Sequence, residues 1–325
     1  MQVYQGIRNL PSPLSSSVLT IGNFDGVHLG HRALIERVVA RAQEKGVSSA
    51  VMTFEPHPVK VLYPDRHLHR IFDLDDQCHQ LERLGVDVLV IEPFSREFSQ
   101  LEPERYLLEW IYRPFVPETL IVGYDFSFGA NRRGSIDFLK EHAPNLGCRV
   151  EVVPPVKVGE VLVSSSRIRQ ALEVGDVSLA NQLLGRSFYL KGIVERGAGR
   201  GRTIGVPTAN LHTSAETLPA RGVYAAWAEV WGTRWKAAVN VGWNPTFVSE
   251  SAGRALSVEA HLIGFGPSPA GLMPPTSDAS TNLYGETIKL EFVQRLRSEK
   301  KFASPGELVQ QIHLDIDSAS RALEG

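Results

Sequence analysis

The sequence predicts an α/β domain followed by a β domain: a parallel sheet with helices on both faces, then an antiparallel barrel with a closing helix. Three observations support this prediction. Short apolar runs alternate with helical patterns as far as residue 184. Strand-like runs then follow one another with no helix among them. The 325 residues suffice for two domains that each bury a core. We therefore expect domains at residues 1–184 and 185–325.

The composition is typical of a soluble globular protein, with 43% hydrophobic and 22% charged residues. A net charge of −2 gives no reason to expect nucleic acid or a membrane as a partner. The N-terminus has no signal pattern, and no apolar run approaches the roughly 20 residues that span a bilayer. Cys78 and Cys148 are expected to be reduced thiols. We therefore expect a cytoplasmic protein, whose oligomeric state the sequence leaves open.

The first domain is expected to contain five strands with helices between them. Its strands are predicted at residues 18–21, 47–54, 86–91, 119–122 and 148–153, and its helices at 32–45, 73–84, 103–112 and 135–142. Ligands of such sheets bind at the carboxyl ends of the strands. The candidate residues of this domain follow those ends.

Residues 20–31 (TIGNFDGVHLGH) form the first candidate site, a tight turn between a strand and a helix. A helix N-terminus attracts phosphate through its unpaired N–H groups and its dipole. His28 and His31 are three residues apart, so both could donate to one oxyanion. A single histidine is more often structural, but the whole pattern is more specific than its parts. The other members of the site are Gly22, Phe24, Asp25 and Gly30.

Two loops after later strands carry aromatic residues. In residues 53–58 (TFEPHP), Pro56 and Pro58 prevent a helix from continuing and hold Phe54 and His57 in a fixed loop. Residues 123–129 (GYDFSFG) place aromatic rings where they could clamp a flat ring. A surface loop with partly buried aromatics is an equal alternative for each. The candidates of the second loop are Asp125, Phe126 and Phe128.

Residues 164–169 (SSSRIR) open a helix that runs to about residue 174, and a short helix follows at 176–184. Hydroxyl groups at a helix start are usually caps. With two arginines, the segment instead predicts a site for the β- and γ-phosphates of a triphosphate whose α-phosphate lies at the two histidines. The members of this site are Ser165, Ser166, Arg167 and Arg169.

The second domain is expected to be a barrel. Its strands are predicted at residues 188–194, 223–230, 235–241, 256–263 and 287–295. A helix at 304–323 is expected to pack on it through Leu308, Ile312 and Ile316. Residues 264–282, rich in proline and serine, predict a loop or insertion.

Residues 197–205 form a glycine loop whose candidate members are Gly199, Gly201, Arg202 and Gly205. Pro207 favours an extended neighbour, so Thr208 and Asn210 project to the same side. Their neutral oxygens suit Mg²⁺, which takes its other ligands from phosphate and water. Without the loop they would be ordinary polar strand residues; with it, a magnesium–nucleotide site is predicted.

Glu259 lies in a predicted strand, either on its solvated face or aimed into a polar site. As a general base that accepts a hydroxyl proton, it could contribute about 10²–10⁴-fold in rate.

Together, these motifs resemble those of the bacterial riboflavin kinase/FMN adenylyltransferase family, the FAD synthetases. The resemblance covers nearly the whole chain and rests on the order of the motifs. They are His-x-Gly-His at 28–31, TFEPHP, GYDFSFG, SSSRIR, PTAN at 207–210, NVGWNPTF at 240–247, VEAH at 258–261 and LRSEKKF at 296–302.

The resemblance implies that a Rossmann-like nucleotidyltransferase domain transfers AMP from ATP to FMN, giving FAD and pyrophosphate. His28 and His31 would stabilise the α-phosphate, Asp125 would position the nucleotide, and the 164–169 segment, with Arg167 as a catalytic residue, would hold the leaving phosphates. The flat ring clamped by the aromatic loops, Phe54, Pro56 and Pro58 with Phe126 and Phe128, would be the flavin.

The same resemblance implies that the barrel transfers the γ-phosphate of ATP to riboflavin, giving FMN. Glu259 would accept the hydroxyl proton, Thr208 and Asn210 would hold Mg²⁺, and Arg297 would lie near the flavin. Three alternatives stay open: an enzyme with one active site, a flavin- or nucleotide-binding regulator without turnover, and a nucleotidyltransferase with another acceptor. The last would not explain the barrel motifs.

Overall fold

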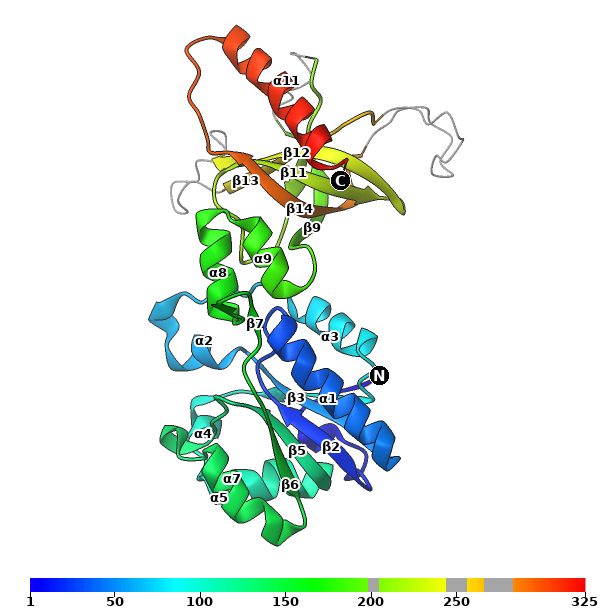
Figure 1. The fold of residues 1–325 in the computed structure, drawn as a ribbon, viewed down its shortest axis with the longest axis vertical. Coiled ribbons are helices and arrows are strands. Elements are labelled where there is room, and N and C mark those ends of the chain that lie inside the picture. The colour runs from blue at the N-terminus through cyan, green and yellow to red at the C-terminus, as the bar shows by residue number, and fades with distance from the viewer. Residues whose placement is uncertain (198–204, 244–255, 266–282, 325) are drawn as a thin grey trace. The chain divides into compact units, whose positions relative to one another are not determined.

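The computed structural model describes residues 1–197, 205–243, 256–265 and 283–324 (Figure 1). It divides into two compact units, residues 1–165 and 166–325. Helices α8 (Ser165–Val174) and α9 (Val177–Leu184) lie between this division and the boundary expected after residue 184. The expected boundary therefore stays a prediction, and each unit is described by itself.

A six-stranded sheet with the strand order β1-β4-β3-β2-β5-β6 forms the centre of the first unit. All neighbouring strands are parallel, which confirms the predicted sheet. The strands are β1 (Gln2–Gln5), β2 (Ser17–Ile21), β3 (Ser48–Glu55), β4 (Val88–Pro93), β5 (Pro117–Gly123) and β6 (Arg149–Val153). Strand β1 was not predicted, because this mostly exposed edge strand has no apolar pattern.

Helices cover both faces of the sheet, as expected. One face is covered by α1 (Leu29–Lys45) and α3 (Leu74–Arg83), the other by α5 (Pro103–Tyr106), the π-helical η3 (Leu107–Tyr112), α6 (Arg113–Phe115) and α7 (Ile136–His142). Shorter elements are η1 (Ile7–Asn9), α2 (Pro58–Leu62), η2 (Pro64–Arg66), α4 (Arg96–Ser99), η4 (Ala130–Arg132), η5 (Ala143–Leu146) and the hairpin of β7 (Lys157–Val158) and β8 (Val161–Leu162).

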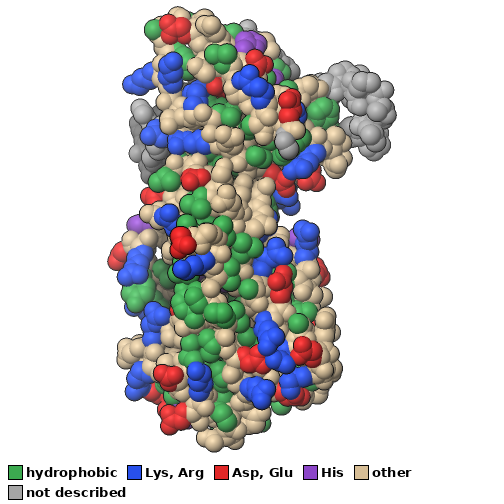
Figure 2. Space-filling view, viewed as in Figure 1, with side chains coloured by type: hydrophobic (Ala, Val, Ile, Leu, Met, Phe, Trp, Pro, Cys, Tyr) green, Lys and Arg blue, Asp and Glu red, His purple; other side chains and the backbone are tan. Residues whose placement is uncertain are grey.

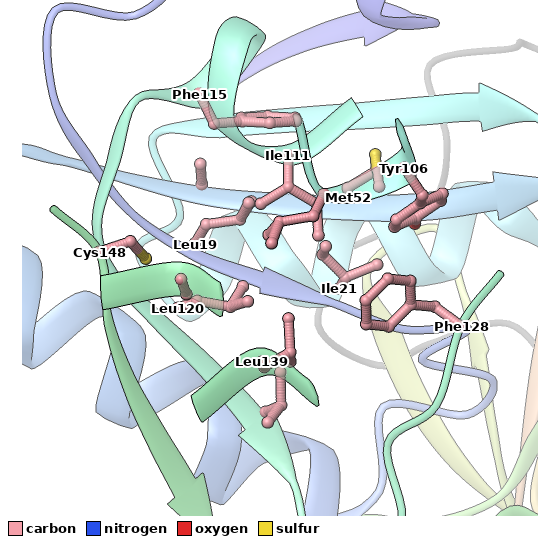
Figure 3. Close-up of a cluster of buried hydrophobic side chains, with 14 of the residues drawn as sticks. Leu19, Ile21, Met52, Tyr106, Ile111, Phe115, Leu120, Phe128, Leu139 and Cys148 are labelled. Carbon is pink, nitrogen blue, oxygen red and sulfur yellow. The ribbon is translucent and has the colours of Figure 1, made fainter. Parts of the chain in front are cut away.

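Side chains of β2 point alternately into the two layers that cover the sheet. Leu19 and Ile21 point into the cluster shown in Figure 3, with Met52 of β3. Val18 points to the opposite face, against Ile35 of α1. Because β2 is buried on both faces, the turn that follows it starts from a rigid base.

Residues 58–62 form a helix where the sequence analysis expected only a loop. Pro58 occupies the first helical position, where a missing N–H costs no hydrogen bond. His57 caps this helix, because its Nδ1 accepts a hydrogen bond from the Val59 N–H at 3.2 Å. The loop expected at residues 53–58 therefore leads directly into a short helix that Pro58 begins.

The second unit contains a closed barrel with the strand order β10-β13-β12-β11-β14-β9, which confirms the predicted barrel. All its pairs are antiparallel. The strands are β9 (Tyr189–Glu195), β10 (Ala209–His212), β11 (Gly222–Val230), β12 (Thr233–Trp243), β13 (Leu256–Leu262) and β14 (Thr287–Arg297). The sixth strand, β10, lies in the segment after Pro207 that was expected to be extended.

Helix α11 (Pro305–Ala322) packs on the barrel through other residues than expected. Ala319 and Leu323 are buried against Ala225 of β11. Leu308 is exposed, so the expected packing through this residue is wrong, whereas Ile312 and Ile316 are partly buried. The small residues near the end of the helix let it approach the strands closely.

An ion pair also fastens α11 to the barrel. Arg297, at the end of β14, donates from Nε and Nη2 to the two carboxylate oxygens of Asp315, at 2.9 Å and 2.7 Å. Gln311 donates to the same carboxylate at 3.0 Å. The fork geometry makes this a strong charge-assisted contact.

Asp315→Ala is expected to destabilise the second unit by roughly 1–3 kcal/mol, because it leaves the largely covered Arg297 without its partner. Asp317→Ala, on the exposed side of the same helix, is the matched control and is expected to stay within about 0.5 kcal/mol. Urea unfolding monitored by tryptophan fluorescence measures both. Equal effects of the two variants would contradict a role for the ion pair.

Basic and acidic side chains are intermixed on the face of each unit seen in Figure 2. Some of them form ion pairs within one unit, such as Arg37 with Glu151 at 3.1 Å and Arg234 with Glu291 at 2.7 Å. Exposed pairs of this kind contribute little to stability.

Candidate active sites

The first candidate site lies at the topological switch point of the parallel sheet. The chain leaves β2 to form β3 and β4 on one side and returns to form β5 and β6 on the other. The loops after β2 and β5 therefore diverge, and ligands of such sheets bind in the opening between them. These are the loops that carry the histidines and the second aromatic motif.

The loop after β2 has an unusual backbone. Phe24 and Val27 have φ angles of 48° and 39°, although both side chains are buried. The left-handed region is disfavoured for such residues, and strain of this kind is concentrated at functional sites. A Cβ at Gly22 would stand 3.0 Å from the Phe24 ring, so a glycine there lets the ring fold back over the strand end.

His28 is the N-cap of α1. Its Nδ1 accepts a hydrogen bond from the His31 N–H at 3.2 Å, so in the neutral imidazole the proton is on Nε2. A Cβ at Gly30 would stand 3.2 Å from the His28 ring, which explains the glycine between the histidines. The cap thus fixes both the tautomer and the orientation of His28.

The His31 ring stacks on the His28 ring at 3.6 Å, with an angle of 15° between their planes. The edge of Phe24 packs against it at 5.3 Å. Burial, and secondly the neighbouring His28, hold the pKa of His31 well below its usual value. Its Nδ1 is buried and has no hydrogen-bond partner in the part of the chain that the structure describes. The geometry therefore provides two stacked imidazoles at a helix N-terminus, where an anion would be stabilised.

The lowered pKa of His31 predicts a stability that depends on pH. Below about pH 6.5, the unfolded chain binds a proton that the folded protein disfavours, so the first unit is expected to lose stability as the pH falls. The slope for one group is at most about 1.4 kcal/mol per pH unit. Hydrogen exchange of the β2 amides between pH 5.5 and 7.5, corrected for intrinsic exchange, measures it. His31→Gln should flatten this dependence, whereas His79→Gln, at an exposed position of α3, should not.

Asp25 connects the loop to two other segments. Its Oδ1 accepts a hydrogen bond from the Ile71 N–H at 3.0 Å, and its carbonyl accepts one from the Ser165 hydroxyl at 2.9 Å. Asp25 is buried, so these contacts hold the loop in place.

The predicted second phosphate cluster begins at Ser165, the last residue of the first unit. Ser166, Arg167 and Arg169 follow in α8, within the second unit. Nη1 of Arg167 donates to Oε1 of Gln170 at 2.5 Å. The joint action of this cluster and the histidines therefore stays a prediction.

Gln77 is a contributor that the sequence analysis missed. It lies on the buried side of α3 and donates from Nε2 to the Asn23 carbonyl at 3.1 Å and to Thr53 Oγ1 at 3.0 Å. These bonds tie the loop after β2 to the end of β3. A polar residue on the apolar face of an amphipathic helix was the signal that could have revealed it.

The aromatic candidates belong to one apolar cluster. Phe54 and Phe126 are partly buried members, and Phe128 is buried. Ring contacts connect them: Phe54 to Phe98 at 5.8 Å, Phe98 to Tyr106 at 5.6 Å, Tyr106 to Phe128 at 4.9 Å and Phe128 to Phe126 at 5.7 Å. Of these three rings, the two partly buried ones leave surface for a ligand, and the buried Phe128 packs against Phe126.

The remaining candidates of this unit lie at the ends of the same strands. Pro56 is exposed, and its peptide bond with Glu55 is cis. Pro58 begins α2. Asp125 is exposed two residues after the end of β5.

The second candidate site is a row of polar side chains across the barrel. Glu259 of β13 pairs directly with Asn210 of β10 on one side and with Asn240 of β12 on the other. Directly paired residues lie on the same face, with Cβ atoms about 4.5–5.5 Å apart. The flanking Val258 and Ala260 are buried in the barrel, so the row is on its outer face, where Glu259 is half-buried. The carboxylate therefore lies between two amides.

The start of the glycine loop lies against this row. A Cβ at Gly197 would overlap the Asn210 carboxamide, so any larger residue there would force the Asn210 side chain to move. Thr208 precedes β10 and is half-buried, and the Pro207 carbonyl lies 2.8 Å from Nδ1 of His261. Gly205 is exposed and has a φ of 78°. Gly199, Gly201 and Arg202 lie outside the described residues.

The donor set of this site suits a magnesium ion shared with phosphates. Among the described residues, no group of three or more His, Cys, Asp or Glu side chains could hold a metal. Thr208 and Asn210 offer two neutral oxygens, and Asn210 lies against the glycine at the loop start. Mg²⁺ bound to a nucleotide needs few protein ligands, because phosphate and water supply the others.

Comparisons with known proteins agree along the whole chain. Residues 10–167 match the family model for FAD synthetase, and residues 184–323 match the model for riboflavin kinase. A Bacillus subtilis protein described as bifunctional riboflavin kinase/FMN adenylyltransferase is 38% identical, covering 94% of this chain and 92% of its own. The Escherichia coli K12 protein of the same description is 34% identical, covering 97% and 96%.

A solved structure from Streptococcus pneumoniae, described as a macrolide-efflux protein, has the same fold. It is 29% identical, with a TM-score of 0.83 and 98% coverage of both chains. Within the described part of the present chain, no helix has the length and apolar character needed to cross a membrane.

Proposed function

The chain belongs to the family of bifunctional riboflavin kinases/FMN adenylyltransferases, and from this premise we propose which residues carry each of its two reactions. The protein phosphorylates riboflavin with ATP to give FMN, and it adenylylates FMN with ATP to give FAD. The observation that carries the assignment is the presence of two separate polar sites, one at the start of α1 and one on the barrel.

Adenylylation takes place at the start of α1. A phosphate oxygen of FMN attacks the α-phosphorus of ATP, and pyrophosphate leaves. The charge that develops on the α-phosphate is stabilised by the N–H groups of His28 and His31 and by the helix terminus. A phosphate near the stacked rings favours the protonated form of the imidazoles, which opposes the effect of burial. Ser165, Ser166, Arg167 and Arg169 hold the leaving phosphates.

The flavin of FMN lies against the two partly buried rings of the aromatic cluster, Phe54 and Phe126. Pro56 and Pro58 border the flavin, and Asp125 positions the nucleotide. The buried residues Gln77 and Asp25 act indirectly, by fixing the loop that carries the histidines.

Phosphorylation takes place on the barrel. Glu259 accepts the proton of the terminal ribityl hydroxyl, whose oxygen attacks the γ-phosphorus of the second ATP, and ADP leaves. The half-buried carboxylate is close enough to the glycine loop for this, since its neighbour Asn210 contacts Gly197. Arg297 lies at the flavin side and holds α11 there through Asp315.

Thr208 and Asn210 would hold the magnesium ion, which supplies charge neutralisation to the phosphates of ATP. Asn210 also orients the neighbouring carboxylate from the adjacent strand. We further propose that the enzyme acts in the cytoplasm, where its small-molecule substrates are found.

The experiment is incubation of the purified chain with riboflavin, ATP and Mg²⁺, followed by chromatographic separation of the flavins. FMN is expected first and FAD afterwards, and FAD alone is expected when FMN is supplied. Formation of only one product from both starting flavins would show that one site is inactive. Bound flavin without any product would favour a regulator.

A further inference from the structure

Asn240 occupies a position in β12 that its side chain does not favour. Asparagine is depleted in strands, because its side chain competes for backbone hydrogen bonds. Val239 and Val241 are fully buried in the barrel, so Asn240 is on the outer face. Local rules are broken most often at functional sites, which makes Asn240 a candidate.

The nearest partner of Asn240 across the strands is the proposed base. Asn240 pairs directly with Glu259, on the side opposite Asn210. Side chains in adjacent strands of one row are about 4.8 Å apart. A substrate chain whose terminal hydroxyl reaches Glu259 therefore brings its next polar group to Asn210 or to Asn240.

A second carboxylate, that of Glu299, lies near the amide of Asn240. Nδ2 of Asn240 and Oε1 of Glu299 lie 3.2 Å and 2.6 Å from the point that a Cβ of Gly242 would occupy. The other oxygen of Glu299 accepts a hydrogen bond from Nη1 of Arg221 at 3.1 Å, which holds the carboxylate. The amino group of Asn240 and the Glu299 carboxylate thus both border the space above Gly242, and an amino group on that side leaves Oδ1 as the acceptor available to a substrate.

We propose that Asn240 binds, through Oδ1, the hydroxyl next to the one that Glu259 deprotonates. The kinase site then recognises a vicinal diol at the end of the substrate chain, with the carboxylate and the amide as two adjacent acceptors. Riboflavin fits because its ribityl chain carries hydroxyls on neighbouring carbons. This inference rests on the proposed function, since it takes Glu259 as the base.

The test compares riboflavin with an analogue whose ribityl chain lacks the hydroxyl next to the terminal one. Asn240→Ala is expected to lower kcat/KM for riboflavin about tenfold, the usual effect of one lost hydrogen bond. For the wild-type protein, kcat/KM is expected to be about tenfold lower with the analogue than with riboflavin. For Asn240→Ala, kcat/KM is expected to be about the same with both substrates. If Asn240→Ala lowered kcat/KM relative to wild type by the same factor on riboflavin and on the analogue, the inference would be overturned.

Two further variants make the comparison robust to folding effects. Asn240→Val introduces a residue that strands favour and removes both polar atoms, so it should reproduce the selective loss in a stable barrel. Gln294→Ala removes an exposed amide of β14 and should change neither substrate. A thermal melt of each variant identifies any that unfolds.

Glu299→Gln tests the orientation of the amide. It keeps the shape but removes the anion near Nδ2, so a loss of about two- to fivefold is expected on riboflavin and none on the analogue. An equal loss on both would contradict the orientation.

Failure of this inference can be told apart from failure of the proposed function. If Glu259→Gln retained turnover, the base assignment would be wrong whatever Asn240 does. If Glu259→Gln were inactive and Asn240→Ala lost the same factor on both substrates, only the diol contact would be refuted.

Discussion

Glu259→Gln is expected to abolish FMN formation from riboflavin and to leave FAD formation from supplied FMN unchanged. Glutamine keeps the size of the side chain and its place between Asn210 and Asn240, but it does not accept a proton. General-base catalysis contributes about 10²–10⁴-fold, so a loss in this range is expected in kcat for the kinase reaction. The FAD reaction is unaffected because it depends on another site.

The two activities are measured separately, by supplying riboflavin or FMN and following the products by chromatography. Glu229→Gln, an exposed carboxylate of β11 on the same barrel, is the matched control and should retain full kinase activity. Kinase turnover within a few-fold of wild type in Glu259→Gln would refute the base assignment. Loss of both activities would point to a folding defect.

The pairing of the two histidines at the start of α1 could be predicted from sequence because it is local. His28 and His31 lie on one turn of one helix, so their spacing alone brings them together. The positive φ of Phe24 and the tautomer of His28 depend on packing and were not predictable from spacing.

The barrel site depends on contacts between distant segments. Asn210, Asn240 and Glu259 come from three strands, and only the register places them in one row. Sequence reasoning identified Asn210 and Glu259 through their motifs, but it left open which face Glu259 occupies and gave no role to Asn240. A register shift of one residue would move Glu259 into the barrel interior, so this row of side chains could be found only from the strand pairing.

For helix α11, the sequence pattern predicts the helix but not the residues through which it packs. Its spacing of Leu308, Ile312 and Ile316 predicts an apolar face correctly as a pattern, but not the part of the helix that meets the barrel. The buried contacts are made by Ala319 and Leu323 against Ala225 of β11 and by the carboxylate of Asp315 with Arg297. Tertiary contacts override the helical pattern here.

The second large effect is expected from replacing both histidines. His28→Ala combined with His31→Ala should stop FAD formation from FMN and spare FMN formation from riboflavin. Removal of one preorganised donor to a developing oxyanion typically costs about 10²–10³-fold, and the two stacked rings serve the same phosphate. The matched control, His79→Ala with His313→Ala, changes two exposed histidines and should affect neither reaction.

His28 also caps α1, so its loss as alanine is expected to cost about 1 kcal/mol of helix stability in addition to the chemistry. His28→Asn separates the two effects, because asparagine is a good N-cap but has no imidazole. If this variant, folded as judged by its melting temperature, formed FAD at near wild-type rate, His28 would be a structural cap only. If it were as inactive as alanine while its stability was retained, the N–H of the imidazole would be required for catalysis, since the cap alone would have been restored.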